Sequence, residues 1–127
     1  IAQEALTRCR SDGFQVAVVV MDRFGETLVL LRDRYAGLPS PATASSKAYT
    51  ALSFRMSTGA FAQAIAAKQL SPELARLPNI VPLAGGLTIE AGGGVVGAIG
   101  VSGAPGGDRD EACARAGLEA VGDKLEF

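Results

Sequence analysis

Residues 15–33 read QVAVVVMDRFGETLVLLRD, and this stretch decides the fold. Its first part, residues 15–22, is rich in β-branched residues, which favours a strand that is buried along most of its length. Residues 23–26 (RFGE) predict a turn in which Gly25 supplies a positive φ, and residues 27–33 (TLVLLRD) predict a second strand. The stretch therefore predicts a β-hairpin.

A second hairpin is expected near the C-terminus, where residues 86–91 (GLTIEA) and 95–102 (VVGAIGVS) flank three consecutive glycines. Gly97 and Gly100 lie inside the second of these strands, and glycines there usually mark the close approach of another backbone or of a ligand. The segments between and around the hairpins show helical spacing of apolar residues and cap-forming residues at their starts. The expected helices span residues 1–12, 40–56, 57–69 and 108–125, with one short turn from Ser71.

Hairpins that are separated by helices predict an antiparallel sheet with helices packed on it, in an α+β fold. The chain has 127 residues, a length typical of one domain, so we expect residues 1–127 to form a single domain. The pattern itself places four strands.

Charge and residue usage exclude several classes of protein. A net charge of −1 without a basic cluster argues against nucleic-acid and membrane-surface partners. No apolar stretch reaches the roughly 18–20 residues that a membrane span needs. The absence of histidine removes Ser-His-Asp and Cys-His catalytic sites and histidine-based metal sites, and we expect no metal site. We expect a cytoplasmic protein; a secreted one stays open because the sequence begins at Ile1, within a helical pattern, rather than at Met.

The two cysteines, Cys9 and Cys113, lie near opposite ends of the chain and show no zinc-binding spacing. We expect two reduced thiols buried in helices, with a disulfide between them as the alternative.

Gly92, Gly94 and Gly97 match the G-x-G-x-x-G pattern of dinucleotide-binding proteins. That motif needs a helix directly after the glycines, so that the helix N-terminus meets the pyrophosphate. Here a strand pattern follows, and we therefore reject a dinucleotide site.

Three blocks of sequence resemble the GlcG/HbpS family, which includes DUF336 domains and the domain fused to PduO-type corrinoid adenosyltransferases. The blocks are VAVVVMDRFGETLVLLRDRYAG (16–37), KAYTALSFRMST (47–58) and AGGLTIEAGGGVVGAIGVSGAPGGDRDEACARAG (84–117). The resemblance implies a profilin-like fold with an antiparallel sheet of about five strands and helices on its faces, and homo-oligomers from dimers to octamers. The chain departs from the family pattern at Arg34, where the family has an acid, and at Thr88, where it has proline.

Thr43, Lys47, Thr50 and Phe54 recur at helical spacing, so they share one stripe of the expected helix. An ammonium group, two hydroxyls and one ring are too polar for a plain core face. The stripe predicts a pocket wall, in which Lys47 binds a carboxylate. The alternative is that Lys47 pairs with a structural acid or reaches solvent, while Thr50 hydrogen-bonds its own helix.

Gly85 and Gly86 are expected to expose backbone N–H groups to the same pocket, with tight turns or subunit packing as the alternative. Asp110 and Glu111 fall in the first turn of the last helix, where interaction with the helix dipole explains them. The alternative is an ion pair with Lys47 or Arg34, from another segment or another subunit.

Some members of the GlcG/HbpS family are described as haem binders or haem degraders, so the resemblance makes haem or a related tetrapyrrole the candidate cofactor. Without histidine, a haem iron needs another protein ligand. Tyr35, in a predicted loop, and Tyr49, on the helix of the predicted pocket, lead the candidates. The other residues of suitable type are Met21, Met56, Cys9, Cys113 and Lys47.

The sequence therefore predicts an oligomeric small-molecule-binding protein of the GlcG/HbpS type. The alternative is an accessory protein or small enzyme acting on a small oxidised metabolite of a hydroxy-acid, oxo-acid or diol pathway. It would use Lys47 as a cation or amine and Asp33, Asp110 or Glu111 as acid–base groups. A purely structural assembly role is the third reading. The predicted ligand-binding residues are Lys47, Thr50, Phe54, Gly85, Gly86, Tyr35 and Tyr49.

Overall fold

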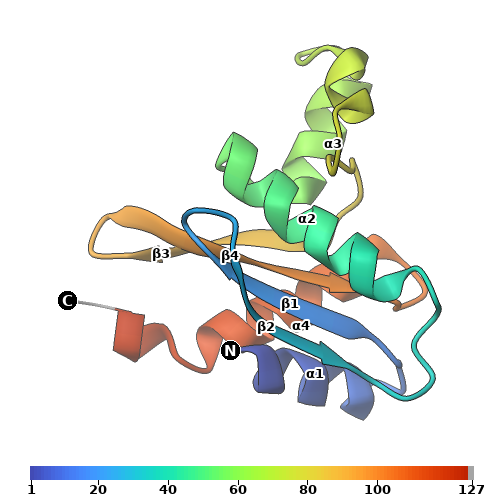
Figure 1. Ribbon diagram of the computed structural model, residues 1–127, viewed down its shortest axis with the longest axis vertical. Coiled ribbons are helices and arrows are strands. Elements are labelled where there is room, and N and C mark those ends of the chain that lie inside the picture. Colours follow the sequence, from blue (N-terminus) through green and yellow to red (C-terminus); the bar gives the residue numbers. More distant parts are fainter. Residues whose placement is uncertain (126–127) are drawn as a thin grey trace.

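The computed structural model describes residues 1–125 and has one four-stranded antiparallel sheet with helices on both faces (Figure 1). The strand order is β2-β1-β4-β3. The α+β class is confirmed, with four strands in place of about five. The strands are β1 (Ala17–Asp22), β2 (Thr27–Arg32), β3 (Gly86–Ala91) and β4 (Gly94–Ser102).

The valine run of β1 is buried because β1 lies in the interior of the sheet and is covered on both faces. Val18 and Val20 belong to the apolar cluster beneath the sheet, and Val19 to the cluster above it. The expected turn follows β1: Asp22 Oδ1 accepts hydrogen bonds from the backbone N–H groups of Phe24 and Glu26, and Gly25 has a φ of 81°.

Helices α1 (Ala2–Ser11) and α4 (Gly107–Glu119) cover one face of the sheet, and α2 (Ser40–Phe54) covers the other (Figure 1). Helix α3 (Thr58–Ala66) and the 3₁₀ turn η1 (Pro72–Arg76) project away from the sheet beyond α2. The remaining element is η2 (Gly122–Leu125).

Several expected helix boundaries differ from the structure, and α3 ends at Ala66 rather than near residue 69. The N-cap of α2 is Pro39, so Ser40 is the first helical residue rather than the cap. Helix α2 ends at Phe54 because Arg55 adopts a left-handed conformation with a φ of 55°. The last helix ends at Glu119, and a separate 3₁₀ turn follows it.

Helix α2 lies directly on the sheet where two glycines are paired, Gly86 of β3 and Gly100 of β4. A Cβ atom at Gly100 would lie 2.0 Å from the Ala44 carbonyl oxygen, and one at Gly86 would lie 2.3 Å from the Lys47 carbonyl oxygen. The expectation that Gly100 marks a close approach is therefore confirmed, and the approaching group is the α2 backbone.

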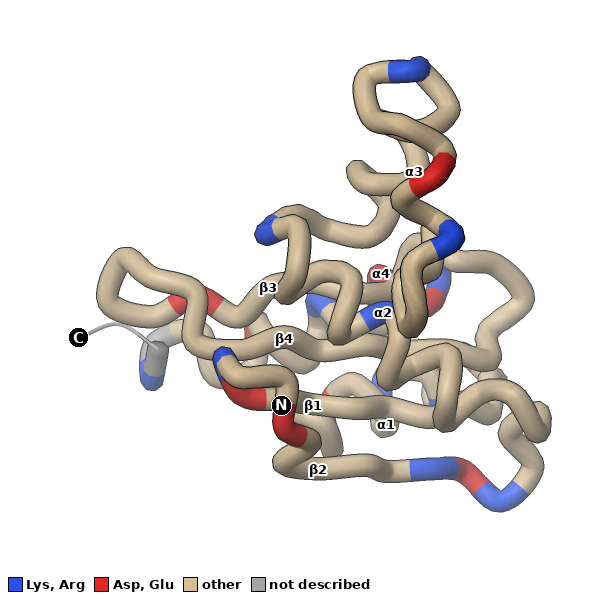
Figure 2. The backbone as a smooth tube through the Cα atoms, turned by 45° about the horizontal axis from the view of Figure 1, so that its top comes forward, with Lys and Arg blue, Asp and Glu red and all other residues tan. Residues whose placement is uncertain are grey.

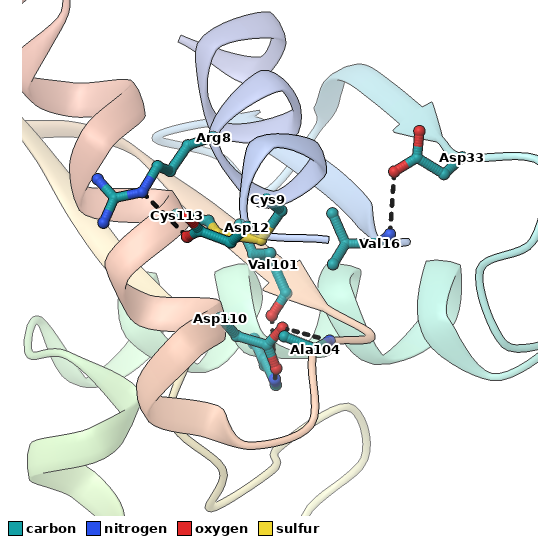
Figure 3. Close-up of a disulfide and its surroundings, with 10 residues drawn as sticks. Arg8, Cys9, Asp12, Val16, Asp33, Val101, Ala104, Asp110 and Cys113 are labelled. Atoms are coloured by element: carbon teal, nitrogen blue, oxygen red, sulfur yellow. Dashed lines mark hydrogen bonds and ion pairs between the residues drawn. A yellow bond between two sulfur atoms is a disulfide. The ribbon is translucent and has the colours of Figure 1, made fainter. Parts of the chain in front are cut away.

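Cys9 of α1 and Cys113 of α4 form a disulfide (Figure 3). The expectation of two reduced thiols is therefore wrong. Both residues point from adjacent helices into the same buried layer, with a Cα–Cα distance of 5.6 Å that suits a bridge. Among the helices of residues 1–125, none combines the length and apolar character needed to cross a membrane.

Candidate functional site

Lys47 and Asp110 form a buried ion pair between α2 and α4. The Lys47 ammonium donates hydrogen bonds to Asp110 Oδ2 and to the Val101 carbonyl oxygen, each with a donor–acceptor distance of 2.9 Å. Asp110 Oδ1 accepts a third bond, from the Ala104 backbone N–H, which Figure 3 shows beside the Val101 carbonyl. Lys47 is 2% exposed and Asp110 3% exposed. The ammonium is thus held by groups of the protein itself.

Burial raises the pKa of Asp110 above its usual value, and the hydrogen bond and charge of Lys47 oppose that rise. The loss of hydration outweighs these opposing effects, so the pKa of Asp110 stays raised. This arrangement matches the structural-acid alternative for Lys47 and the ion-pair alternative for Asp110.

Gly85 and Gly86 do lie against Lys47, as the sequence predicts. Gly85 has a φ of 132°, and a Cβ atom there would lie 2.8 Å from Lys47 Nζ and 2.5 Å from the Val101 carbonyl oxygen. The Gly86 N–H donates to Thr58 Oγ1 over 2.8 Å. The glycines therefore make room for the lysine side chain and the backbone of α2.

The other predicted residues of the α2 stripe also bind groups of the protein. Thr50 Oγ1 accepts a hydrogen bond from the Val81 N–H over 3.0 Å and donates to the Asn79 carbonyl oxygen over 3.4 Å. The ring of Phe54 stacks on that of Phe61, with ring centroids 4.6 Å apart. The stripe thus fastens the segment before β3 and the start of α3 to helix α2.

The structure does not bring Tyr35 and Tyr49 into the Lys47 cluster. Tyr35 is exposed in the loop after β2, and Tyr49 is an exposed residue of α2. The Tyr49 ring lies beside Gly25 in the turn between β1 and β2, where a Cβ atom on that glycine would be 3.9 Å from the ring.

Two of the predicted acid–base groups have partners of their own. Asp33 is buried, accepts a hydrogen bond from the Val16 N–H and pairs with Arg10. Glu111 pairs with Arg115 one helical turn later.

A surface hollow of about 360 Å³ lies between the β1–β2 turn, the C-terminal end of α2 and the start of β4. Neither of its two arginines forms an ion pair with a residue of the described part of the chain, and the Arg23 guanidinium lies over the Phe24 ring, 5.9 Å from its centroid. The hollow combines two cations with apolar side chains, and Tyr49 packs on the same turn. Its lining residues are Arg23, Phe24, Leu52, Arg55 and Val95.

The lining of this hollow comes from three segments that are far apart in the sequence, and the sequence analysis missed it. The only local signal was that Tyr49 and Leu52 stand three positions apart on α2, with Arg55 directly after the end of that helix.

The sequence matches, over residues 1–119, the family described as "Haem degrading protein HbpS-like". No curated protein is significantly similar to the chain. Among solved structures, a double mutant of Streptomyces reticuli HbpS is 42% identical, with a TM-score of 0.88 over 94% of this chain and 80% of that one.

Two further solved structures share the fold. The Klebsiella pneumoniae protein ORFY, of the DUF336 family, is 27% identical, with a TM-score of 0.89 over 95% of this chain and 84% of that one. PduOC, solved as a haem complex, is 24% identical, with a TM-score of 0.87 over 93% of this chain and 86% of that one. Together with the match over residues 1–119, the similarity to HbpS shows that this chain belongs to the HbpS-like family.

Proposed function

We propose that this protein binds haem or a related tetrapyrrole, as a homo-oligomer, in the hollow between the β1–β2 turn and α2. The observation that carries the proposal is that Arg23 and Arg55, which form no ion pair within the described residues, line one hollow together with three apolar side chains. A tetrapyrrole has the matching chemistry, a flat apolar ring with carboxylate substituents. Membership of the HbpS-like family and the haem complex of PduOC, which has the same fold, support this choice of ligand.

Each residue of the hollow has a role in this proposal. Arg23 and Arg55 bind the propionates, since guanidinium–carboxylate bonds are among the stronger hydrogen bonds in proteins. Phe24, Leu52 and Val95 contact the ring. The hollow is of the size of small-molecule sites and is open to solvent, so it encloses one part of the ligand.

Of the residues predicted from the sequence, the proposal keeps Tyr49 as a contact. A phenolate can ligate haem iron, and Tyr49 packs on the turn that carries Arg23 and Phe24. The buried residues Lys47, Thr50, Phe54, Gly85 and Gly86 serve in the proposal as the support that holds α2 in place. Tyr35, exposed in its loop, has no role in it.

The test is a titration of the metal-free protein with haemin, followed by the Soret band. We expect saturable binding, and binding weaker by about tenfold or more in the variant Arg23→Gln/Arg55→Gln, since two charge-assisted contacts are lost. The matched control is Arg8→Gln/Arg76→Gln, which removes two exposed arginines elsewhere and should bind as the wild type does.

Two further arms of the titration separate the ring from the iron. Tyr49→Phe should shift the Soret band of bound haemin while binding stays saturable. The binding of iron-free protoporphyrin should be weakened by loss of the two arginines but not by Tyr49→Phe. Weak, non-saturating changes like those of an unrelated protein would overturn the proposal.

The enzyme alternative depends on access of a substrate to Lys47. Lys47 is 2% exposed and its ammonium already donates to Asp110 and to the Val101 carbonyl oxygen, so a substrate would have to displace a buried ion pair. The binding role requires no such rearrangement.

The disulfide bears on the compartment, because disulfides persist in oxidising environments and are rare in the cytosol. The bond between Cys9 and Cys113 therefore favours the secreted alternative, and we propose that location in place of the cytoplasm. Fractionation of cells, with thiol alkylation before lysis, tests it: recovery of the chain in the cytosol with both thiols alkylated would overturn the proposal.

A further inference from the structure

Strand β2 presents an apolar edge that residues 1–125 leave open. It is the last strand on its side of the sheet (Figure 1). Its residues Thr27, Leu28, Val29 and Leu30 are all exposed. Leu28 is 63% exposed and Leu30 50% exposed. The opposite edge strand, β3, is mostly buried. An exposed apolar edge strand is a ready template for pairing with another strand.

Alternate residues of β2 also direct their backbone N–H and C=O groups toward that open edge. The Asp33 N–H donates to the Val16 carbonyl oxygen over 2.9 Å, and Leu31 is aligned with Val18. In an antiparallel ladder, hydrogen-bonded pairs alternate with pairs whose backbone groups point away. The N–H and C=O groups of Leu30 and Arg32 therefore point away from β1.

The charges at the two ends of β2 are opposite in sign. Glu26 precedes the strand, and Arg32 and Arg34 lie at its other end, where Figure 2 shows a basic stretch with one acid inside it. That acid, Asp33, is buried and paired with Arg10, so it does not neutralise the two arginines. Within the described part of the chain, Glu26, Arg32 and Arg34 form no ion pair.

A strand with this charge pattern complements an antiparallel copy of itself. A two-fold axis at Val29 places Glu26 of one copy opposite Arg32 of the other, and an axis at Leu30 places it opposite Arg34. A parallel arrangement would align like charges instead, which is unfavourable. Because the axis is two-fold, each favourable pair occurs twice.

We propose that β2 pairs with β2 of a second copy of this chain in antiparallel orientation, so that one sheet runs through both copies. This proposal specifies a surface for the assembly part of the proposed function and does not depend on haem binding.

The first test uses charge reversal in the ligand-free protein, with mass measured by sedimentation velocity. The variant Glu26→Arg and the variant Arg32→Glu/Arg34→Glu should each weaken the dimer by about tenfold or more, because attraction becomes repulsion. An equal mixture of the two should form a mixed dimer, since every pair across the axis is again of opposite sign. Circular dichroism confirms that each variant is folded.

The second test addresses the apolar edge. Leu30→Lys should weaken the dimer, whereas Leu83→Lys, which changes an equally exposed leucine (51%) in the segment before β3, should not. Hydrogen exchange reports on the pairing directly: the amides of Leu30 and Arg32 should be protected in the dimer and exchange fast in the charge-reversal variants.

A dimer that none of these variants weakens, or in which the Leu30 and Arg32 amides exchange fast, would overturn β2 pairing while the proposed oligomer stands. A wild-type monomer would overturn both. The haemin titration of the Arg23→Gln/Arg55→Gln variant reports on the ligand separately.

Discussion

Asp110 Oδ2 lies 2.9 Å from Lys47 Nζ, although the two residues are 63 positions apart in the sequence. The pair joins the helix above the sheet to the helix below it, past the end of β4. It makes α2, α4 and the Val101 carbonyl one hydrogen-bonded unit inside the domain.

Replacement of one partner should destabilise the protein strongly. Lys47→Met leaves the Asp110 carboxylate buried without its cation, and such losses cost about 3–5 kcal/mol. Urea unfolding at neutral pH measures the change. The double variant Lys47→Met/Asp110→Leu should lose less than the sum of the two single variants, because it removes both charges. Strictly additive losses would show that the pair does not act as a unit.

The raised pKa of Asp110 predicts a pH dependence of stability. The folded state binds the proton more tightly than the unfolded chain, whose pKa is near the usual 3.8. The contribution of this carboxyl is therefore fully present below pH 3.8 and is lost as the pH rises through the folded pKa. The free energy of unfolding of the wild type, minus that of Asp110→Asn, should therefore fall over this pH range. The difference isolates Asp110, because the other carboxyls titrate in both proteins. A difference that stays constant or grows with pH would contradict this.

Loss of the disulfide should cost about 2–5 kcal/mol, because the bridge joins two residues that are 104 positions apart in the sequence. Denaturant unfolding with and without a reductant measures the loss, and Cys9→Ala/Cys113→Ala serves as the control that a reductant should not affect. Thiol titration of the unreduced, denatured wild type should find no free thiol, and two free thiols would show that the bridge is absent.

Gly100→Ala should displace α2, because the new methyl group would lie 2.0 Å from the Ala44 carbonyl oxygen. Overpacking of this kind costs about 1–3 kcal/mol or more. Gly94→Ala, on the same strand, is the matched control, since its Cβ would meet no atom within 4 Å. Equal melting temperatures for the two variants would show that the close contact of α2 with Gly100 does not affect stability.

Local patterns predicted the two hairpins almost to the residue, because turn glycines and β-branched runs act over a few positions. The stripe through Lys47 was also visible, and an ion pair with Asp110 was one of the alternatives. The sequence could not select it, because Asp110 faces Lys47 only after α4 docks on the sheet. The disulfide depends in the same way on the packing of α1 beside α4. The arginine-lined hollow gathers Arg23 and Val95 from separate hairpins, which no short pattern reports.

The glycine pair beneath α2 has a consequence for the hollow at the C-terminal end of that helix. Gly86 and Gly100 fix how deeply α2 sits on the sheet, and this helix carries Leu52 and is followed directly by Arg55. The shape of a surface that meets solvent is thus set by two residues that never touch it. Substitutions at these buried glycines can therefore change ligand preference while every side chain that lines the hollow stays the same.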